Sequence, residues 1–244
     1  MKKAILAVSF GTSHEDAERT CIRPVEQALQ RGFPDWEVRR AFTSRQIQRK
    51  LNQRGQAVES EEQALARLRD EGFERILVVP THIIPGEEYG VVAAAAQGLD
   101  VAEPLLYSDK DLEWMAGVLS EIAKEEGRPL LMMGHGTEHT ADSIYSRLRE
   151  KLPSGVFLAC VEGEQTLQTI QPALEAQGAR RVTLMPLMLV AGDHAKNDMA
   201  GDQPDSWRSI LEARGFEVRA RLQGLGALES VQRRFVEKAR RAAG

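Results

Sequence analysis

Short apolar runs alternate with longer amphipathic stretches along the whole chain. The apolar runs are Ala4–Val8, Trp36–Arg40, Arg75–Val79, Leu130–Met133, Val156–Cys160, Val182–Met185 and Glu217–Ala220. The stretches with helical periodicity are Glu15–Gln30, Glu61–Asp70, Asp111–Glu125, Ala141–Lys151, Gln165–Gln177 and Ala227–Arg241. Strands that read as continuous apolar runs are typical of sheets covered by helices on both faces. The pattern therefore predicts an α/β fold with mainly parallel sheets.

Two stretches of sequence that follow predicted strands occur in two similar copies. Ser9–His14 aligns with Gly134–His139 at an offset of 125, and Pro80–Glu88 aligns with Pro186–His194 at an offset of 106. The repeat predicts two similar lobes that face one another, residues 1–127 and 128–244, each a mainly parallel sheet flanked by helices. Ligands of such sheets bind at the carboxyl ends of the strands, where all four copies lie. A chance match of short glycine-containing strings is the alternative explanation.

The composition narrows the class of protein. The chain has 42% hydrophobic and 28% charged residues, as ordinary globular proteins do, and 32 basic against 36 acidic residues. A net charge of −4 argues against a general nucleic-acid binder, whose affinity comes from neutralising phosphates. The two cysteines, Cys21 and Cys160, form no CxxC pair, which argues against a zinc knuckle or a disulfide-stapled secreted fold.

The N-terminal apolar run and the longest apolar stretches bear on localisation. The run after Lys3 stops at Ser9, which is too short for the hydrophobic core of a signal peptide. No stretch approaches the roughly 20 apolar residues that a membrane-spanning helix needs. We therefore expect a cytoplasmic protein with neither a membrane nor a nucleic acid as partner.

Three polar residues at predicted strand ends could hold a metal ion. His135 follows one strand between two glycines, Glu162 follows the next strand, and His194 ends a long apolar loop. Two neutral imidazoles and a carboxylate suit divalent cobalt, nickel, iron or zinc, and they leave coordination positions open. Each residue also has a structural explanation, because a loop histidine can cap a helix and a carboxylate is favourable at a helix N-terminus. The spacing of the three residues matches no established metal-binding motif.

Two further segments carry candidate chemistry in the first half of the chain. The stretch Thr81–Tyr89 offers a histidine, two adjacent carboxylates and a tyrosine, with Glu88 at the position that His194 holds in the second copy. The stretch Arg39–Arg54 contains six basic residues and no acidic one. It could be a solvated helix face, or it could form a rim that binds an anion with several carboxylates.

Four of these segments together resemble a known family. Ser9–Ser13, His82–Tyr89, Met133–Gly136 and Leu184–His194 are similar to the anaerobic cobalt chelatases of cobalamin synthesis (CbiK type), ATP-independent class II chelatases related to protoporphyrin ferrochelatase. The resemblance runs from residue 3 to about residue 226, and it implies a fold of two similar α/β lobes with an inter-lobe cleft. The run that ends in His194 is long and specific, whereas the Gly-His-Gly element alone is weak.

The resemblance implies a function and a set of site residues. The function is insertion of divalent cobalt, the substrate metal, into sirohydrochlorin without a nucleotide. The family's metal ligands fall on His135, Glu162 and His194, and the carboxylate of its His-Ile-Ile element falls on Glu88, which would act with the two histidines in catalysis. One departure follows Glu162, where Gly163 and Glu164 stand in place of an expected Pro-containing stretch. The residues that would contact the macrocycle are Phe10, Gly11, Thr12, Tyr89, Leu187 and Met188.

Several alternatives remain open from the sequence alone. A chelatase for iron or nickel would keep every residue role and change only the metal. A non-catalytic tetrapyrrole or metal carrier would use the same cleft without turnover, and a pair of lobes like those of periplasmic binding proteins is a further option. The apolar C-terminal helix Leu228–Ala239 could join the interface of a homo-oligomer.

Overall fold

The chain folds into two compact units. A computed structural model describes residues 1–178 and 180–244. Unit 1 comprises Met1–Leu105 and Gly226–Gly244, and unit 2 comprises Leu106–Leu225. The sequence analysis placed a single boundary between residues 127 and 128. The units divide differently because helix α6 packs on the second sheet and the last helix, α10, returns to the first.

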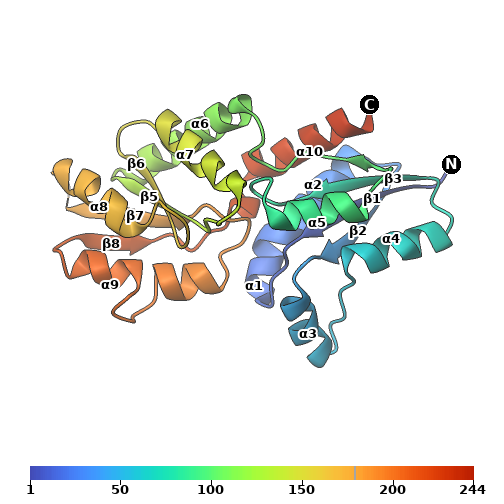
Figure 1. Ribbon diagram of the computed structural model, residues 1–244, viewed down its shortest axis with the longest axis horizontal. Coiled ribbons are helices and arrows are strands. Elements are labelled where there is room, and N and C mark those ends of the chain that lie inside the picture. Colours follow the sequence, from blue (N-terminus) through green and yellow to red (C-terminus); the bar gives the residue numbers. More distant parts are fainter. Residues whose placement is uncertain (179) are drawn as a thin grey trace. The chain divides into compact units, whose positions relative to one another are not determined.

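Unit 1 contains a four-stranded parallel sheet in the order β2-β1-β3-β4 (Figure 1). Its strands are β1 (Lys3–Ser9), β2 (Glu37–Phe42), β3 (Arg75–Pro80) and β4 (Asp100–Val101). Its helices are α1 (Glu15–Ala17), the π-helix η1 (Glu18–Ile22), α2 (Arg23–Gly32), α3 (Arg45–Gln53), α4 (Glu61–Asp70), α5 (Glu87–Ala95) and α10 (Glu229–Ala243). The 3₁₀ turn η4 (Leu225–Ala227) begins at the last residue of unit 2 and continues into unit 1.

Unit 2 contains a second four-stranded parallel sheet in the equivalent order, β6-β5-β7-β8. Its strands are β5 (Leu130–Gly134), β6 (Val156–Cys160), β7 (Arg181–Pro186) and β8 (Glu217–Ala220). Its helices are α6 (Asp109–Glu126), the 3₁₀ turn η2 (Thr140–Asp142), α7 (Ser143–Lys151), α8 (Leu167–Ala176), the π-helix η3 (His194–Met199) and α9 (Trp207–Glu212). The α/β class with two parallel sheets is therefore confirmed.

The predicted repeat is confirmed at the level of strand register. Val8 pairs with Pro80 in the first sheet, and Met133 pairs with Pro186 in the second, which are the offsets of 125 and 106 found in the sequence. The hydrogen bond from the Thr81 amide to the Val8 carbonyl has its counterpart between Leu187 and Met133. The loops that follow β5, β6 and β7 thus occupy the same places as those that follow β1, β2 and β3.

Helices cover both faces of each sheet, as the continuous apolar strands predict. In unit 1 the side chains of α4 and α5 pack with Ala4, Leu6 and Val8 of β1, while α2 and α10 pack together and contact β2 and β3. In unit 2 the side chains of α8, η3 and α9 pack with Leu131 and Met133 of β5, while α6 and α7 contact β5 and β6. The packed cores fix the strand ends, and the loops that leave those ends carry the candidate site.

Serine residues form the N-caps of several helices. Ser44, Ser60, Ser108 and Ser206 each accept a hydrogen bond from a backbone amide in the first turn of α3, α4, α6 and α9, respectively. Helix α6 ends at Gly127, whose φ of 61° lies in the left-handed region that favours glycine. No helix in the described part of the chain combines the length and the apolar character that crossing a lipid bilayer requires.

Candidate metal site

The first two candidate ligands lie at the ends of neighbouring strands. His135 follows β5, and Glu162 comes two residues after β6. The amide of Val161 donates to the carbonyl of Gly134 (3.0 Å), and the amide of Glu162 donates to the carbonyl of His135 (2.9 Å). These two hydrogen bonds continue the parallel ladder beyond the strands. They hold His135 and Glu162 side by side through the backbone.

The two glycines that flank His135 allow this close approach of the two strand ends. Gly136 has a φ of +80°, and a Cβ atom there would overlap the carbonyl of Glu162 and lie 2.9 Å from the Cβ atom of Cys160. A Cβ atom at Gly134 would lie 2.9 Å from the Sγ atom of Cys160. Glycines on both sides of a loop histidine can also permit the close approach of a bulky ligand. In the structure the group that approaches is the chain's own backbone.

Cys160 lies directly beneath this loop, but its thiol does not suit metal binding. Burial raises the pKa of Cys160 to about 12, so the thiol stays protonated at neutral pH. The thiolate is the form of cysteine that binds metals. Cys160 therefore serves as a packing residue under the His135 loop.

His194 comes from the segment that follows β7. This segment runs to the π-helix η3, in which Ala195 and Met199 are buried in the core of unit 2. The burial of these two side chains leaves His194 and Asp198 on the outer side of the helix. The Nδ1 atom of His194 lies 2.5 Å from the Oδ2 atom of Asp198. Single π-helical turns are often found at functional sites.

The structure brings the rings of His135 and His194 together. Their centroids are 4.8 Å apart, and the ring planes are nearly perpendicular, at 88°. Two imidazoles that bind one ion at about 2.0–2.1 Å have ring centres about 4.5–5.2 Å apart. The observed spacing therefore suits a single ion shared by the two rings.

Hydrogen bonds also fix which nitrogen of each ring is available. The Nδ1 atom of His135 lies 3.0 Å from the carbonyl oxygen of Gly136, and that of His194 contacts the Asp198 carboxylate. Both partners are acceptors, so each Nδ1 atom carries the proton and donates it. Each Nε2 atom then keeps its lone pair, which is the form of histidine that binds a metal ion.

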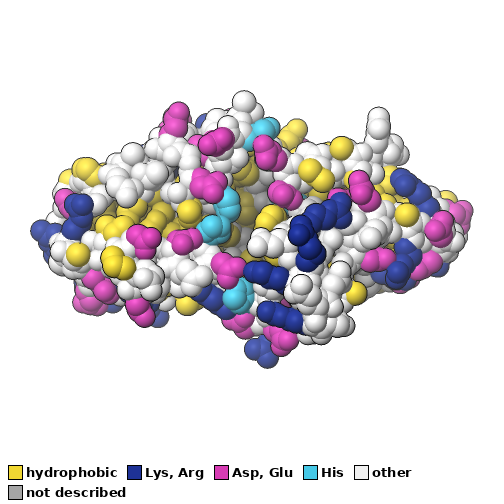
Figure 2. Space-filling model, turned by 60° about the horizontal axis from the view of Figure 1, so that its bottom comes forward, with side chains coloured by type: hydrophobic (Ala, Val, Ile, Leu, Met, Phe, Trp, Pro, Cys, Tyr) yellow, Lys and Arg dark blue, Asp and Glu magenta, His cyan; other side chains and the backbone are white. Residues whose placement is uncertain are grey.

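Glu162 lies near the pair without completing a ligand set. Its Oε2 atom is 4.0 Å from the Nδ1 atom of His135, and its side chain is 58% exposed. Within residues 1–178 and 180–244, no three His, Cys, Asp or Glu side chains are arranged at metal-binding distances. Rotation of the exposed Glu162 side chain is needed to bring a carboxylate oxygen to an ion held by the two rings. Figure 2 shows histidine side chains next to acidic ones on the surface.

The expected substrate-binding residues differ in their exposure. Phe10, after β1, is 49% exposed, whereas Thr12 is buried and its hydroxyl accepts a hydrogen bond from the amide of His14. Leu187 is fully buried because its amide continues the β5–β7 ladder and its side chain enters the core. Met188 packs against that core and is only partly buried. Leu187 thus supports the loop from beneath and offers no surface to a ligand in this structure, contrary to the expectation.

The remaining expected residues of unit 1 follow β1 and β3. Gly11 has a φ of +102°, and a Cβ atom there would lie 2.6 Å from the Cδ2 atom of the Phe42 ring. Glu88 and Tyr89 lie in the first turn of α5, and both are half-buried.

Three of the six basic residues in segment 39–54 form ion pairs with carboxylates outside that segment. Arg40 forms ion pairs with Glu18 and Glu26, both at 2.6 Å. Although burial opposes it, these hydrogen bonds hold the pKa of Arg40 above its usual range. Arg39 pairs with Glu37 and Glu71, and Arg45 pairs with Glu61 and Glu62. Half of the expected anion-binding rim is therefore already paired with carboxylates.

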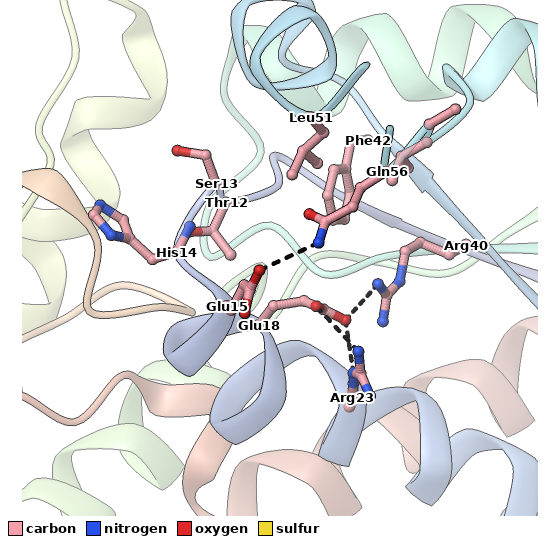
Figure 3. A pocket seen from close by; sticks show the side chains of 12 residues that line it. Thr12, Ser13, His14, Glu15, Glu18, Arg23, Arg40, Phe42, Leu51 and Gln56 are labelled. Atoms are coloured by element: carbon pink, nitrogen blue, oxygen red, sulfur yellow. Dashed lines mark hydrogen bonds and ion pairs between the residues drawn. The ribbon is translucent and has the colours of Figure 1, made fainter. Parts of the chain in front are cut away.

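A polar cavity of ≈ 230 Å³ lies beside Arg40 in unit 1 (Figure 3). Glu18 stands between Arg40 and Arg23 and binds both guanidinium groups. Gln56 donates to the carboxylate of Glu15 across the same cavity. Because the arginines already have carboxylate partners, the cavity has little to offer a further anion.

His82 is partly buried, and both of its ring nitrogens are buried and lack hydrogen-bond partners among the described residues. Burial lowers the pKa of His82 from 6.5 to about 4, because a charged imidazole is poorly solvated there. The imidazole of His82 is therefore protonated near pH 6.5 in the unfolded chain, but only near pH 4 in the folded chain. The stability that neutral His82 contributes is complete above pH 6.5 and is lost as the pH falls towards 4.

We expect this histidine to make stability depend on pH. Between pH 7 and pH 5 the protein should lose about 2 kcal/mol of unfolding free energy through His82 alone. In His82→Leu that part of the pH dependence should vanish, whereas replacing the exposed His139 by Asn should leave it unchanged. Urea unfolding at the two pH values measures the effect. An equal loss in the wild type and in His82→Leu would contradict the assignment.

Asp198 is the residue near the site that the sequence analysis did not single out. Its position four residues after His194 was visible in the sequence, but η3 was not predicted. Without a helix, a spacing of four residues carries no information about contact.

Comparison with known proteins gives a consistent result over the full chain. The family model described as "Cobalt chelatase (CbiK)" matches residues 3–243. A sirohydrochlorin cobaltochelatase of Salmonella typhimurium is 36% identical, and the alignment covers 97% of this chain and 94% of that protein. The sirohydrochlorin cobaltochelatase CbiKC of Nitratidesulfovibrio vulgaris is 35% identical over 93% of this chain and 86% of that protein.

Proposed function

Because the chain belongs to the CbiK family of cobalt chelatases, we propose that it inserts divalent cobalt into sirohydrochlorin without ATP. The observation that carries the proposal for the site is the contact between the rings of His135 and His194, with both Nε2 atoms available. These residues lie far apart in the sequence and belong to different strand ends. Their convergence at a spacing that suits one ion supports a metal-binding role.

In this proposal the two histidines capture the metal first. Imidazole nitrogen binds divalent first-row metals well, and cobalt lies within that range. Glu162 turns towards the ion and supplies a third, anionic ligand. Three protein ligands leave coordination positions free, so the pyrrole nitrogens can bind the ion while the protein ligands leave it one by one.

The reaction also releases two protons. Free sirohydrochlorin carries two pyrrole N–H groups, and the metal complex carries none, so one cobalt ion enters for every two protons that leave. A neutral imidazole or a carboxylate near the ion can accept them. We assign this work to His135, His194 and Glu88, the last on the family resemblance. Binding that holds the macrocycle bent would expose the nitrogen lone pairs to the metal.

The macrocycle requires apolar contacts for its faces and cations for its carboxylates. Phe10 and Met188, both at strand ends and both accessible, are suited to the first task. Arg49 and Lys50 of α3 are exposed and form no ion pair among the described residues, so they remain available for the second. This restricts the anion-binding role expected of residues 39–54 to the end of α3.

The proposal also covers the cofactors of the enzyme, its cellular compartment and its partners. No GxxxxGK[ST] phosphate loop occurs in the sequence, which supports a reaction without a nucleotide. The free thiols of Cys21 and Cys160 fit a reducing compartment, the cytoplasm. The partner of the enzyme is its tetrapyrrole substrate, and assembly into a homo-oligomer remains a prediction.

Metal insertion followed by absorbance tests the function. Purified protein, sirohydrochlorin and divalent cobalt without ATP should give catalytic turnover, with many products per protein molecule. Stoichiometric binding without turnover would favour a carrier instead. A higher kcat/KM with ferrous iron or nickel at controlled free metal would keep the site and change the physiological metal.

A further inference from the structure

We propose that Asp198 is a positioning residue that orients His194 for metal capture. The inference rests on the proposed metal-binding role of His194. Its basis is the short contact, 2.5 Å, between the Asp198 Oδ2 atom and the His194 Nδ1 atom, in which the ring N–H donates to a carboxylate. A carboxylate on the rear nitrogen of a metal-binding imidazole fixes the tautomer and the orientation of the ring.

The contact acts on His194 in two ways. The carboxylate accepts the Nδ1 proton, so the lone pair stays on Nε2, and it stops the ring from rotating about its side-chain bonds. His135 obtains the same result from a neutral acceptor, the carbonyl of Gly136, at 3.0 Å. The two rings thus have unequal partners. The carboxylate holds the His194 ring more firmly than the neutral carbonyl holds the ring of His135, because hydrogen bonds to ionised groups are the stronger kind.

The location of Asp198 argues against a packing role. Its side chain is 49% exposed, and it lies on the side of η3 that faces away from the core. The residues that anchor this helix are Ala195 and Met199, both fully buried. Loss of the Asp198 carboxylate should therefore change the metal site and leave the fold intact.

The test measures cobalt binding to the protein without tetrapyrrole. Titration of Asp198→Ala with divalent cobalt, followed by its visible absorption, should show an affinity about 10–100-fold weaker than that of the wild type. In turnover assays the KM for cobalt should rise by a similar factor, while the KM for sirohydrochlorin stays unchanged. Asp198→Asn keeps an oxygen acceptor without the charge and should recover part of the affinity.

Asp202 offers a matched control on the same stretch of chain. Its side chain is 95% exposed and pairs with Arg208, so Asp202→Ala removes the same charge without touching His194. Equal cobalt affinity in Asp198→Ala and Asp202→Ala would overturn the inference. So would a KM for sirohydrochlorin that rises together with the KM for cobalt.

His194→Ala separates this inference from the proposed function. If His194→Ala loses cobalt binding while Asp198→Ala keeps it, the metal site stands and only the positioning role fails. If His194→Ala itself keeps full affinity, the assignment of the metal site fails, and the role of Asp198 fails with it.

Discussion

Replacing either His135 or His194 by alanine is expected to lower the rate of cobalt insertion at least about 100-fold. Each ring contributes one of the two nitrogen ligands that an ion would share at the observed 4.8 Å ring spacing. Removing one leaves a single imidazole and an exposed carboxylate, a poor site for a divalent ion. The measurement is the initial rate of the absorbance change of sirohydrochlorin at saturating cobalt and at low cobalt.

The double variant, in which His135 and His194 are both replaced by alanine, tests whether the two residues bind the same ion. Two residues that hold one ion act as a unit, so the loss in the double variant should be far smaller than the product of the two single losses. His139→Ala is the control, because His139 is an exposed histidine of the same unit whose ring accepts a hydrogen bond from the amide of Ala141. Full activity in both single variants would reject the site.

Glu162→Gln should have a smaller effect than either histidine substitution. The carboxylate lies 4.0 Å from the nearest ring nitrogen of His135 and is more exposed than either imidazole. Its contribution therefore depends on a side-chain rotation, and the free energy of that rotation reduces what the ligand adds. A loss as large as that of His194→Ala would show that Glu162 is a principal ligand.

The architecture could be predicted from local patterns because strands and repeats leave local signals. Val156–Cys160 and Glu217–Ala220 were predicted with the bounds that the structure shows. The offsets of the repeated loops correspond to the pairing of Val8 with Pro80 and of Met133 with Pro186. The repeat therefore implied that the two sheets share one register, which the structure confirms.

Other features depend on contacts between distant segments and were not predictable. The basic segment 39–54 has no acid within it, yet Glu18 and Glu26 reach Arg40 from a different helix. Helix α6 joins the second sheet although it precedes β5, because its packing partners come later in the chain. Helix α5 buries only Val92 and has no apolar periodicity, so the sequence contains no amphipathic pattern from which its extent could be predicted.

The close approach of the two histidines was predictable in part, because one aspect of it has a local sequence signal and another depends on tertiary contacts. That His135 and His194 follow neighbouring strands, β5 and β7, was implied by the repeat, which places both at the same edge of a sheet. That their rings meet depends on the π-helical start of η3, which no local pattern predicts. The sequence thus identified the correct edge of the sheet, whereas the side-chain geometry required the tertiary structure.

Gly136→Ala is expected to disrupt this geometry more than any other single-methyl change in the loop. A residue with a Cβ atom is strained at a φ of +80°, and the added atom would overlap the carbonyl of Glu162. Backbone strain and overpacking together should cost about 3 kcal/mol of unfolding free energy. The Glu162 segment must move away from His135 to make room, so cobalt affinity should fall as well.

Gly155→Ala separates the overlap from the backbone strain. Gly155 has a φ of +83°, and a Cβ atom there would meet nothing within 4 Å. Its substitution should cost only about 1 kcal/mol, the penalty of the left-handed conformation, and should leave cobalt binding unchanged. Urea unfolding and cobalt titration of the two variants measure both effects. If Gly136→Ala lost no more stability and no more affinity than Gly155→Ala, the close contact between the two strand ends would not be what places His135 beside Glu162.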